Sequence, residues 1–106
     1  MRRVRIHAAA SGEAAEAAAW YEKERPGLGA EFEQAIEAAL DLLEEEIVPL
    51  VSVLGASSAR GVKRLLLRRF PYAVIVREAA TEVVVIAFAH TARRPGYWRD
   101  RLKGGA

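Results

Sequence analysis

Residues 72–90 read YAVIVREAATEVVVIAFAH, two apolar runs joined by a short polar link. Both runs are rich in β-branched and aromatic residues, which predicts strands at 72–78 and 82–90 joined by a tight turn. In the second run the residues of both parities are apolar, so we expect this strand to lie inside a sheet, buried on both faces. The preceding run VKRLLLRRF, residues 62–70, adds a third strand and predicts an antiparallel meander.

The first half of the chain predicts one more strand. The segment RVRIHA, residues 3–8, places Val4, Ile6 and Ala8 on one side and polar residues on the other, the alternation of a half-buried strand. We expect this strand to pair beside residues 82–90.

Two helices should follow as a hairpin. An alanine-rich segment predicts a helix from about Gly12 to Arg25, capped by Ser11, and RPGLG at 25–29 ends it. The segment LGAEFEQAIEAALDLLEEEI, residues 28–47, predicts the second helix from one apolar stripe: Phe32, Ile36, Leu40, Leu43 and Ile47. Pro49 and GASSARG at 55–61 then indicate a loop of about a dozen residues.

Size and composition narrow the class of protein. The 106 residues suit a single domain, residues 1–106. The absence of cysteine excludes disulfides, cysteine-type zinc sites and thiol nucleophiles, and two histidines make a metal site improbable, so we expect no metal and no cofactor. No run approaches the roughly 20 apolar residues of a membrane helix and no signal-peptide core is present, so a cytoplasmic protein is expected.

Charge is unevenly distributed along the chain. Residues 1–61 hold six Lys or Arg against eleven Asp or Glu, whereas residues 62–106 hold ten against three. This asymmetry predicts a basic surface able to meet phosphates or an acidic partner, although a merely solvated surface would give the same count.

The predicted meander has two different faces. Leu65, Leu67, Val74 and Val76 would cover the helical hairpin, while the opposite face would expose Leu66 and Ile75 among arginines. Apolar residues rimmed by cations are typical of a binding surface, although single apolar residues are also normal on a protein surface.

The segment HTARRPGYW, residues 90–98, follows the interior strand and concentrates chemically capable side chains. His90 could act as a base and Tyr97 as a proton donor; alternatively His90 ends the strand, and Tyr97 and Trp98 anchor one or two terminal helical turns on the sheet.

Three segments carry a family resemblance: AAAWYEKERPGLGAEFEQAIEAAL at 17–40, RRFPYAVIVRE at 68–78 and AHTARRPGYWRDRL at 89–102. Together they resemble the ParE/RelE superfamily of type II toxin–antitoxin (plasmid stabilisation) toxins, over nearly the whole chain from Val4 to Leu102. The resemblance implies an α+β fold of order β-α-α-β-β-β: a helical hairpin on a four-stranded, mostly antiparallel sheet, with a short C-terminal helical tail.

The resemblance also implies partners. ParE-like toxins poison DNA gyrase and cause growth arrest, RelE-like toxins cleave messenger RNA in the ribosome, and both are neutralised by a cognate antitoxin in a hetero-oligomer. Because the lysine-rich region of RelE-like enzymes is reduced here to Lys63, we expect a non-enzymatic gyrase inhibitor. The alternatives are a ribosome-dependent endoribonuclease and a non-toxic binding module on the same fold.

The candidate site residues divide between these hypotheses. If the chain is RelE-like, the catalytic residues would be Arg68, His90 and Tyr97. Residues expected to bind the antitoxin or the target are Arg64, Leu66, Arg68, Arg69, Ile75, Arg77, Arg93, Arg94 and Trp98. An acidic, partly apolar antitoxin segment would lie on the leucine and isoleucine and pair with the arginines.

Overall fold

The computed structural model describes residues 2–46, 51–52 and 61–105, and its elements confirm the predicted α+β class. In chain order they are β1 (Arg3–Ile6), α1 (Ala8–Glu24), α2 (Leu28–Glu45), β2 (Val51–Ser52), β3 (Val62–Leu66), β4 (Tyr72–Glu78), β5 (Glu82–His90) and the 3₁₀ helix η2 (Arg99–Gly105). The sheet order is β1-β5-β4-β3-β2; β1 is parallel to β5 and the other neighbours are antiparallel.

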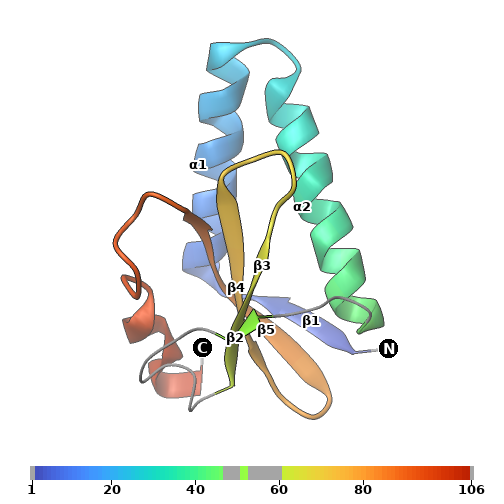
Figure 1. The fold of residues 1–106 in the computed structure, drawn as a ribbon, viewed down its shortest axis with the longest axis vertical. Helices are drawn as coiled ribbons and strands as arrows, with labels where there is room; N and C mark the ends of the chain where they lie inside the picture. Colours follow the sequence, from blue (N-terminus) through green and yellow to red (C-terminus); the bar gives the residue numbers. More distant parts are fainter. Residues whose placement is uncertain (1, 47–50, 53–60, 106) are drawn as a thin grey trace.

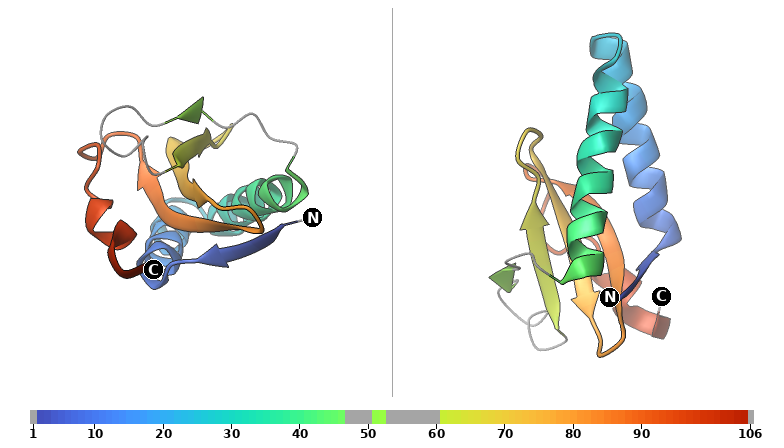
Figure 2. Two further views of the ribbon diagram at one scale, coloured as in Figure 1. Left: turned by 90° about the horizontal axis from the view of Figure 1, so that it is seen from below. Right: turned by 90° about the vertical axis from the view of Figure 1, so that its right-hand side faces the viewer.

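The helical hairpin α1–α2 packs against one face of the sheet and extends beyond it (Figures 1 and 2). The stripe predicted for α2 is largely confirmed, since Phe32, Ile36 and Leu43 are buried and Leu40 is half-buried. Across from it, β4 and β5 contribute buried valines and Phe88 to the same core. Ile47, the last residue of the predicted stripe, lies outside the described residues.

The interior position of β5 is confirmed. Residues 83–89 are all buried, with β1 on one side and β4 on the other. An irregularity in the pairing with β4 falls between Ile75 and Val76, where Ile75 pairs with Ala87 and Val76 with Val85. The strand therefore contributes apolar side chains to both faces of the sheet.

The second face of the sheet is not bare, which corrects the expectation for Ile75. Trp98 and Leu102 from the C-terminal segment pack there with Ile75, Val84 and Ile86, and Ile75 is only 5% exposed. The predicted terminal turns and the anchoring by Trp98 are confirmed. Leu66, on the neighbouring strand, remains 52% exposed as expected.

The start of α1 differs from the prediction by one turn. The helix begins at Ala8 rather than near Gly12, and its N-cap is His7, whose Nδ1 accepts a hydrogen bond from the Ala9 N–H at 3.0 Å. Ser11 lies inside the helix. The reason is that a histidine nitrogen cap and three strong helix-forming alanines let the helix follow β1 without a linker.

The burial of the first strand differs from the prediction. β1 is an edge strand that turns directly into α1, so Val4 is only half-buried, while Ile6 and Ala8 are exposed rather than facing a core.

β3 ends at Leu66 rather than continuing to Phe70, because the chain turns and the Phe70 ring packs 5.0 Å from the Tyr21 ring. The predicted long loop contains β2, whose Val51 pairs with Arg64; residues 47–50 and 53–60 lie outside the described residues.

The junction of the two helices depends on a close approach at Gly29. The Glu22 carboxylate accepts hydrogen bonds from the backbone N–H groups of Gly27 and Gly29, which satisfies donors at the start of α2. A Cβ at position 29 would lie 2.6 Å from the Ala18 carbonyl oxygen of α1. The absence of a side chain at Gly29 thus sets the spacing of the helices.

Two glycine substitutions should therefore have opposite effects. Gly29→Ala should lower the free energy of unfolding by about 1–3 kcal/mol, because its methyl group meets backbone. Gly12→Ala should raise it by about 0.5–1 kcal/mol, because position 12 is helical with open space around it. Urea unfolding of both variants measures this, and equal effects would contradict the close approach.

Candidate functional site

His90 ends β5 and opens a turn that directs the C-terminal segment across the sheet. Its Nδ1 accepts a hydrogen bond from the Ala92 N–H at 3.0 Å, and its carbonyl oxygen accepts one from the Arg93 N–H at 3.0 Å. Its ring lies edge-on to Tyr72, with centroids 5.1 Å apart. Because Nδ1 is an acceptor, the neutral ring carries its proton on Nε2.

Glu13 of α1 is the centre of the polar contacts in this region. One carboxylate oxygen accepts from the Phe88 N–H at 3.1 Å, and the other accepts from the Tyr97 hydroxyl at 2.6 Å. Arg101 donates to both oxygens, at 2.9 and 3.0 Å, and Arg93 lies 3.7 Å away. The Glu13 side chain is only 13% exposed. This carboxylate joins α1, β5 and the C-terminal segment.

Sequence reasoning missed this role of Glu13. A helix starting near Gly12 would have Glu13 in its first turn, whereas the helix starts at Ala8 and has no acidic residue in its first turn. A signal was present, because Glu13 lies among alanines on the helix and Ala10 and Ala17, on the same side, are buried. A carboxylate on a packed face needs partners.

Tyr97 is held as a neutral phenol. Burial, and then the hydrogen bond and the negative charge of Glu13, raise the pKa of Tyr97 far above its ordinary value. The Arg93 guanidinium lies 3.7 Å from the centroid of the Tyr97 ring. These contacts favour the interpretation in which Tyr97 anchors the C-terminal segment over the one in which it takes part in catalysis.

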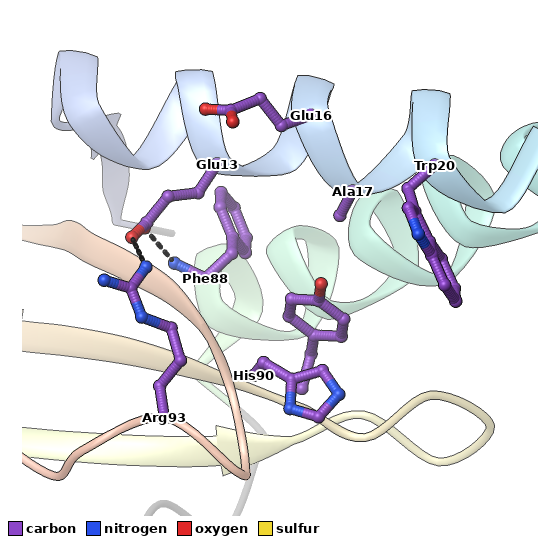
Figure 3. A pocket seen from close by; sticks show the side chains of 8 residues that line it. Glu13, Glu16, Ala17, Trp20, Phe88, His90 and Arg93 are labelled. Carbon is purple, nitrogen blue, oxygen red and sulfur yellow. Dashed lines mark hydrogen bonds and ion pairs between the residues drawn. The ribbon is translucent and has the colours of Figure 1, made fainter.

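A cavity of about 290 Å³ lies between α1 and the ends of β4 and β5. Figure 3 shows Trp20, Ala17, Glu16 and Glu13 on the helix above it and His90 and Arg93 below. We call it the Trp20 pocket, and its lining residues are Glu13, Glu16, Ala17, Trp20, Tyr72, Phe88, His90 and Arg93.

A second hollow, of about 440 Å³, lies between α2 and β3. We call it the leucine groove, and its lining residues are Ala35, Ala38, Ala39, Leu42, Leu65, Leu66, Leu67, Arg68 and Arg69. Leu42 is 37% exposed and Leu66 52% exposed, and both arginines are exposed. Arg69 pairs with Glu31, whereas Arg68 forms no ion pair with any residue that the structure describes. The groove is apolar with a cationic end.

The three residues expected to be catalytic do not line one cavity. His90 and Tyr97 share a hollow of about 140 Å³ on the sheet face that the C-terminal segment covers. Arg68 lies in the turn between β3 and β4 and lines the leucine groove instead. Proton transfer beside a crowded phosphate needs base, cation and donor within reach of one substrate position. This arrangement does not bring the three groups around such a position.

The residues expected to bind a partner fall into two groups. Arg64, Leu66, Arg68, Arg69, Arg93 and Arg94 are exposed. Ile75 and Trp98 are buried together, and Arg77 is half-buried and donates to the Leu102 carbonyl oxygen at 3.2 Å. A partner could contact Ile75 or Trp98 only if the C-terminal segment moved.

Neither described helix has the length and hydropathy of a bilayer span. In the ranges 2–46, 51–52 and 61–105, no three His, Asp or Glu side chains are grouped as a metal site would require.

The order of elements, an N-terminal strand, a helical hairpin, a meander and a covering C-terminal segment, defines a ParE/RelE-like fold. A solved structure described as "Chromosomal ParDE TA system from P. aeruginosa" contains a chain of this fold: the TM-score is 0.71 at 16% identity, covering 85% of this chain and 96% of that chain. The sequence matches no protein-family model and no curated protein. The likeness establishes the fold.

Removal of the Glu13 carboxylate should destabilise the chain. Glu13→Ala leaves Tyr97 without its acceptor and Arg101 with only the Ile86 carbonyl oxygen, in a largely buried setting, so we expect a loss of about 2–3 kcal/mol in the free energy of unfolding. Glu16→Ala, one turn further along the same helix, removes an exposed carboxylate and should change it by less than about 0.5 kcal/mol. Urea unfolding compares the two, and equal losses would argue against the Glu13 contacts.

The three tyrosines should ionise late and unequally. Burial raises the pKa of Tyr21, Tyr72 and Tyr97, and that of Tyr97 the most. Because the folded-state pKa of Tyr97 is raised, its contribution to stability is complete below its unfolded pKa of about 10 and is lost as the pH rises beyond that value. Tyrosinate absorbance measured during alkaline titration should show that Tyr21 and Tyr72 ionise before the chain unfolds and that Tyr97 ionises last. Tyr97→Phe should remove this last ionisation. A Tyr97 that ionises first would contradict this arrangement.

Proposed function

We propose that this chain is the toxin of a type II toxin–antitoxin module, neutralised by a cognate antitoxin. The observation that carries the proposal is the fold shared over 85% of the chain with a chain of the ParDE structure. The motifs at 17–40, 68–78 and 89–102, which resemble the ParE/RelE superfamily, support it independently.

The leucine groove is the surface we assign to the antitoxin. Its exposed Leu42 and Leu66 offer apolar area, and Arg68 supplies an exposed cation at one end. A segment that carries leucine or isoleucine on one side and carboxylates on the other would gain apolar burial and charge-assisted hydrogen bonds. Arg64 and Arg69 extend the cationic surface around Leu66.

DNA gyrase is the target that we favour. The alternative, a ribosome-dependent endoribonuclease, requires cooperation among Arg68, His90 and Tyr97. Arg68 lines a different hollow from the other two, and the Tyr97 hydroxyl is bonded to Glu13. These observations favour a mechanism without bond cleavage by the chain, in which a bound toxin blocks its target.

A single induction experiment tests the function and the target together. Expression without the antitoxin should arrest growth, the purified chain should inhibit gyrase supercoiling, and transcripts in ribosome-containing extract should stay intact. Uninhibited gyrase at saturating chain would refute the target. Normal growth on induction would refute the toxin function.

The antitoxin surface can be tested with two matched substitutions. Leu66→Glu should weaken binding of the protein encoded beside the gene by about tenfold or more, because an apolar contact is lost and an acidic segment is repelled. Ile6→Glu places the same charge on an exposed apolar residue of the distant edge strand and should leave binding unchanged. Titration calorimetry measures both, and equal effects would contradict the assignment of the groove.

A further inference from the structure

Trp20 is unusual among the large aromatic residues of this chain. Its side chain is 57% exposed, whereas Phe32, Phe70, Phe88 and Trp98 are each less than 10% exposed. Its ring contacts Tyr21 edge-on, with centroids 5.2 Å apart, so one side of the indole faces the Trp20 pocket (Figure 3). Exposed tryptophans beside a cavity are common centres of protein–protein binding energy.

The opposite wall of the pocket offers hydrogen-bonding atoms. The Tyr72 hydroxyl forms no hydrogen bond with any residue in the described ranges, and its ring is fixed against His90 and Phe32. Burial raises the pKa of Tyr72, so the hydroxyl stays neutral and its oxygen can accept a hydrogen bond. Trp20, Tyr72 and His90 thus enclose a space with aromatic walls, and the small Ala17 side chain lies on its helix side.

The charges around this space favour a cation. Glu13 is satisfied by Arg101, and Arg93 is stacked on Tyr97 near Glu13. Glu16, by contrast, is exposed and pairs with no residue among those described. Glu16 lines the pocket, but in Figure 3 its carboxylate points away from His90, so the side chain has to rotate to meet a ligand there.

Exposed carboxylates outnumber the exposed cations, Lys23 and Arg25, on the rest of the described hairpin surface. The residues Glu24, Glu33, Glu37, Asp41 and Glu45 are all exposed on α1 and α2. A single-stranded nucleic acid could stack a base on Trp20, but its phosphates would then meet this acidic surface. A basic protein segment would be attracted by it.

We propose that the Trp20 pocket binds an arginine side chain presented by a protein partner. The planar guanidinium stacks on the Trp20 indole and donates hydrogen bonds to the Tyr72 oxygen and the Glu16 carboxylate. Arginine fits better than lysine because a flat, multiply donating group matches a flat ring with acceptors at its edge. The site is independent of the proposed toxin function, since it shares no lining residue with the leucine groove.

The purified chain can be tested directly by nuclear magnetic resonance. It has two tryptophans, one exposed and one buried, so the indole N–H signals of Trp20 and Trp98 are assigned with the single variant Trp20→Phe. The probe is the capped peptide acetyl-Gly-Arg-Gly-amide; acetyl-Gly-citrulline-Gly-amide, of the same shape without the charge, is its control. We expect the arginine peptide to shift the Trp20 signal in a saturable way and leave the Trp98 signal unchanged.

Matched variants locate the charge that is recognised. Glu16→Gln should weaken binding of the arginine peptide by about fivefold, which is the effect of one exposed ion pair. Asp41→Asn makes the same change of charge on the other helix and should leave this affinity unchanged. Trp20→Ala should abolish the response of the Tyr72 ring signals, with circular dichroism confirming the fold. The proposal is overturned if citrulline binds equally well, if both charge variants act alike, or if guanosine monophosphate shifts Trp20 where the arginine peptide does not.

Discussion

The Glu13 carboxylate is the contact on which the arrangement of both ends of the chain depends. It comes from the second turn of α1, yet it accepts hydrogen bonds from a backbone N–H of β5, from the hydroxyl of Tyr97 and from the guanidinium of Arg101. A mostly buried carboxylate with several donors is fixed in position, because any displacement would leave a charge without partners. Glu13 lines the Trp20 pocket and also holds Tyr97 and Arg101 of the segment that covers the outer sheet face.

The leucine groove and the Trp20 pocket differ in chemistry. The leucine groove is apolar and ends in arginines, whereas the Trp20 pocket is aromatic and opens beside acidic side chains of α1. The uneven charge of the two halves of the sequence therefore has a spatial counterpart, since the hairpin comes from the acidic half and β3 and β4 come from the basic half. Through their charge, the two sites can select partners of opposite sign: an acidic partner at the leucine groove and a basic partner at the Trp20 pocket.

Much of the fold could be predicted from the sequence because periodicity reports burial. The strands at 72–78 and 82–90 and the stripe of α2 have strong apolar patterns, and their positions were confirmed. The start of α1 was predicted wrongly, because a histidine nitrogen, not a serine hydroxyl, caps it. Local patterns cannot rank two nearby caps whose choice depends on where β1 ends.

The site was less predictable for a physical reason. Exposure of Ile75 was inferred from its own strand, but it is decided by Trp98 and Leu102, more than twenty residues away in the sequence. In the same way Glu13 meets Arg101 across 88 positions, a separation that no spacing rule within one helix or strand describes. Leu66 and the exposed arginines were placed correctly because nothing distant in the described chain covers them.

The parallel pairing of β1 with β5 has a consequence for the order of folding during synthesis. Arg3 pairs with Glu82, so β1 has no partner in the sheet until β5 has been made. The outer face of β5 then stays uncovered until Trp98 and Leu102 emerge. Contacts of such long range form slowly, and the native sheet cannot close before β5 has been made. The hairpin is made before β3, β4 and β5, so its apolar face stays uncovered until these strands follow.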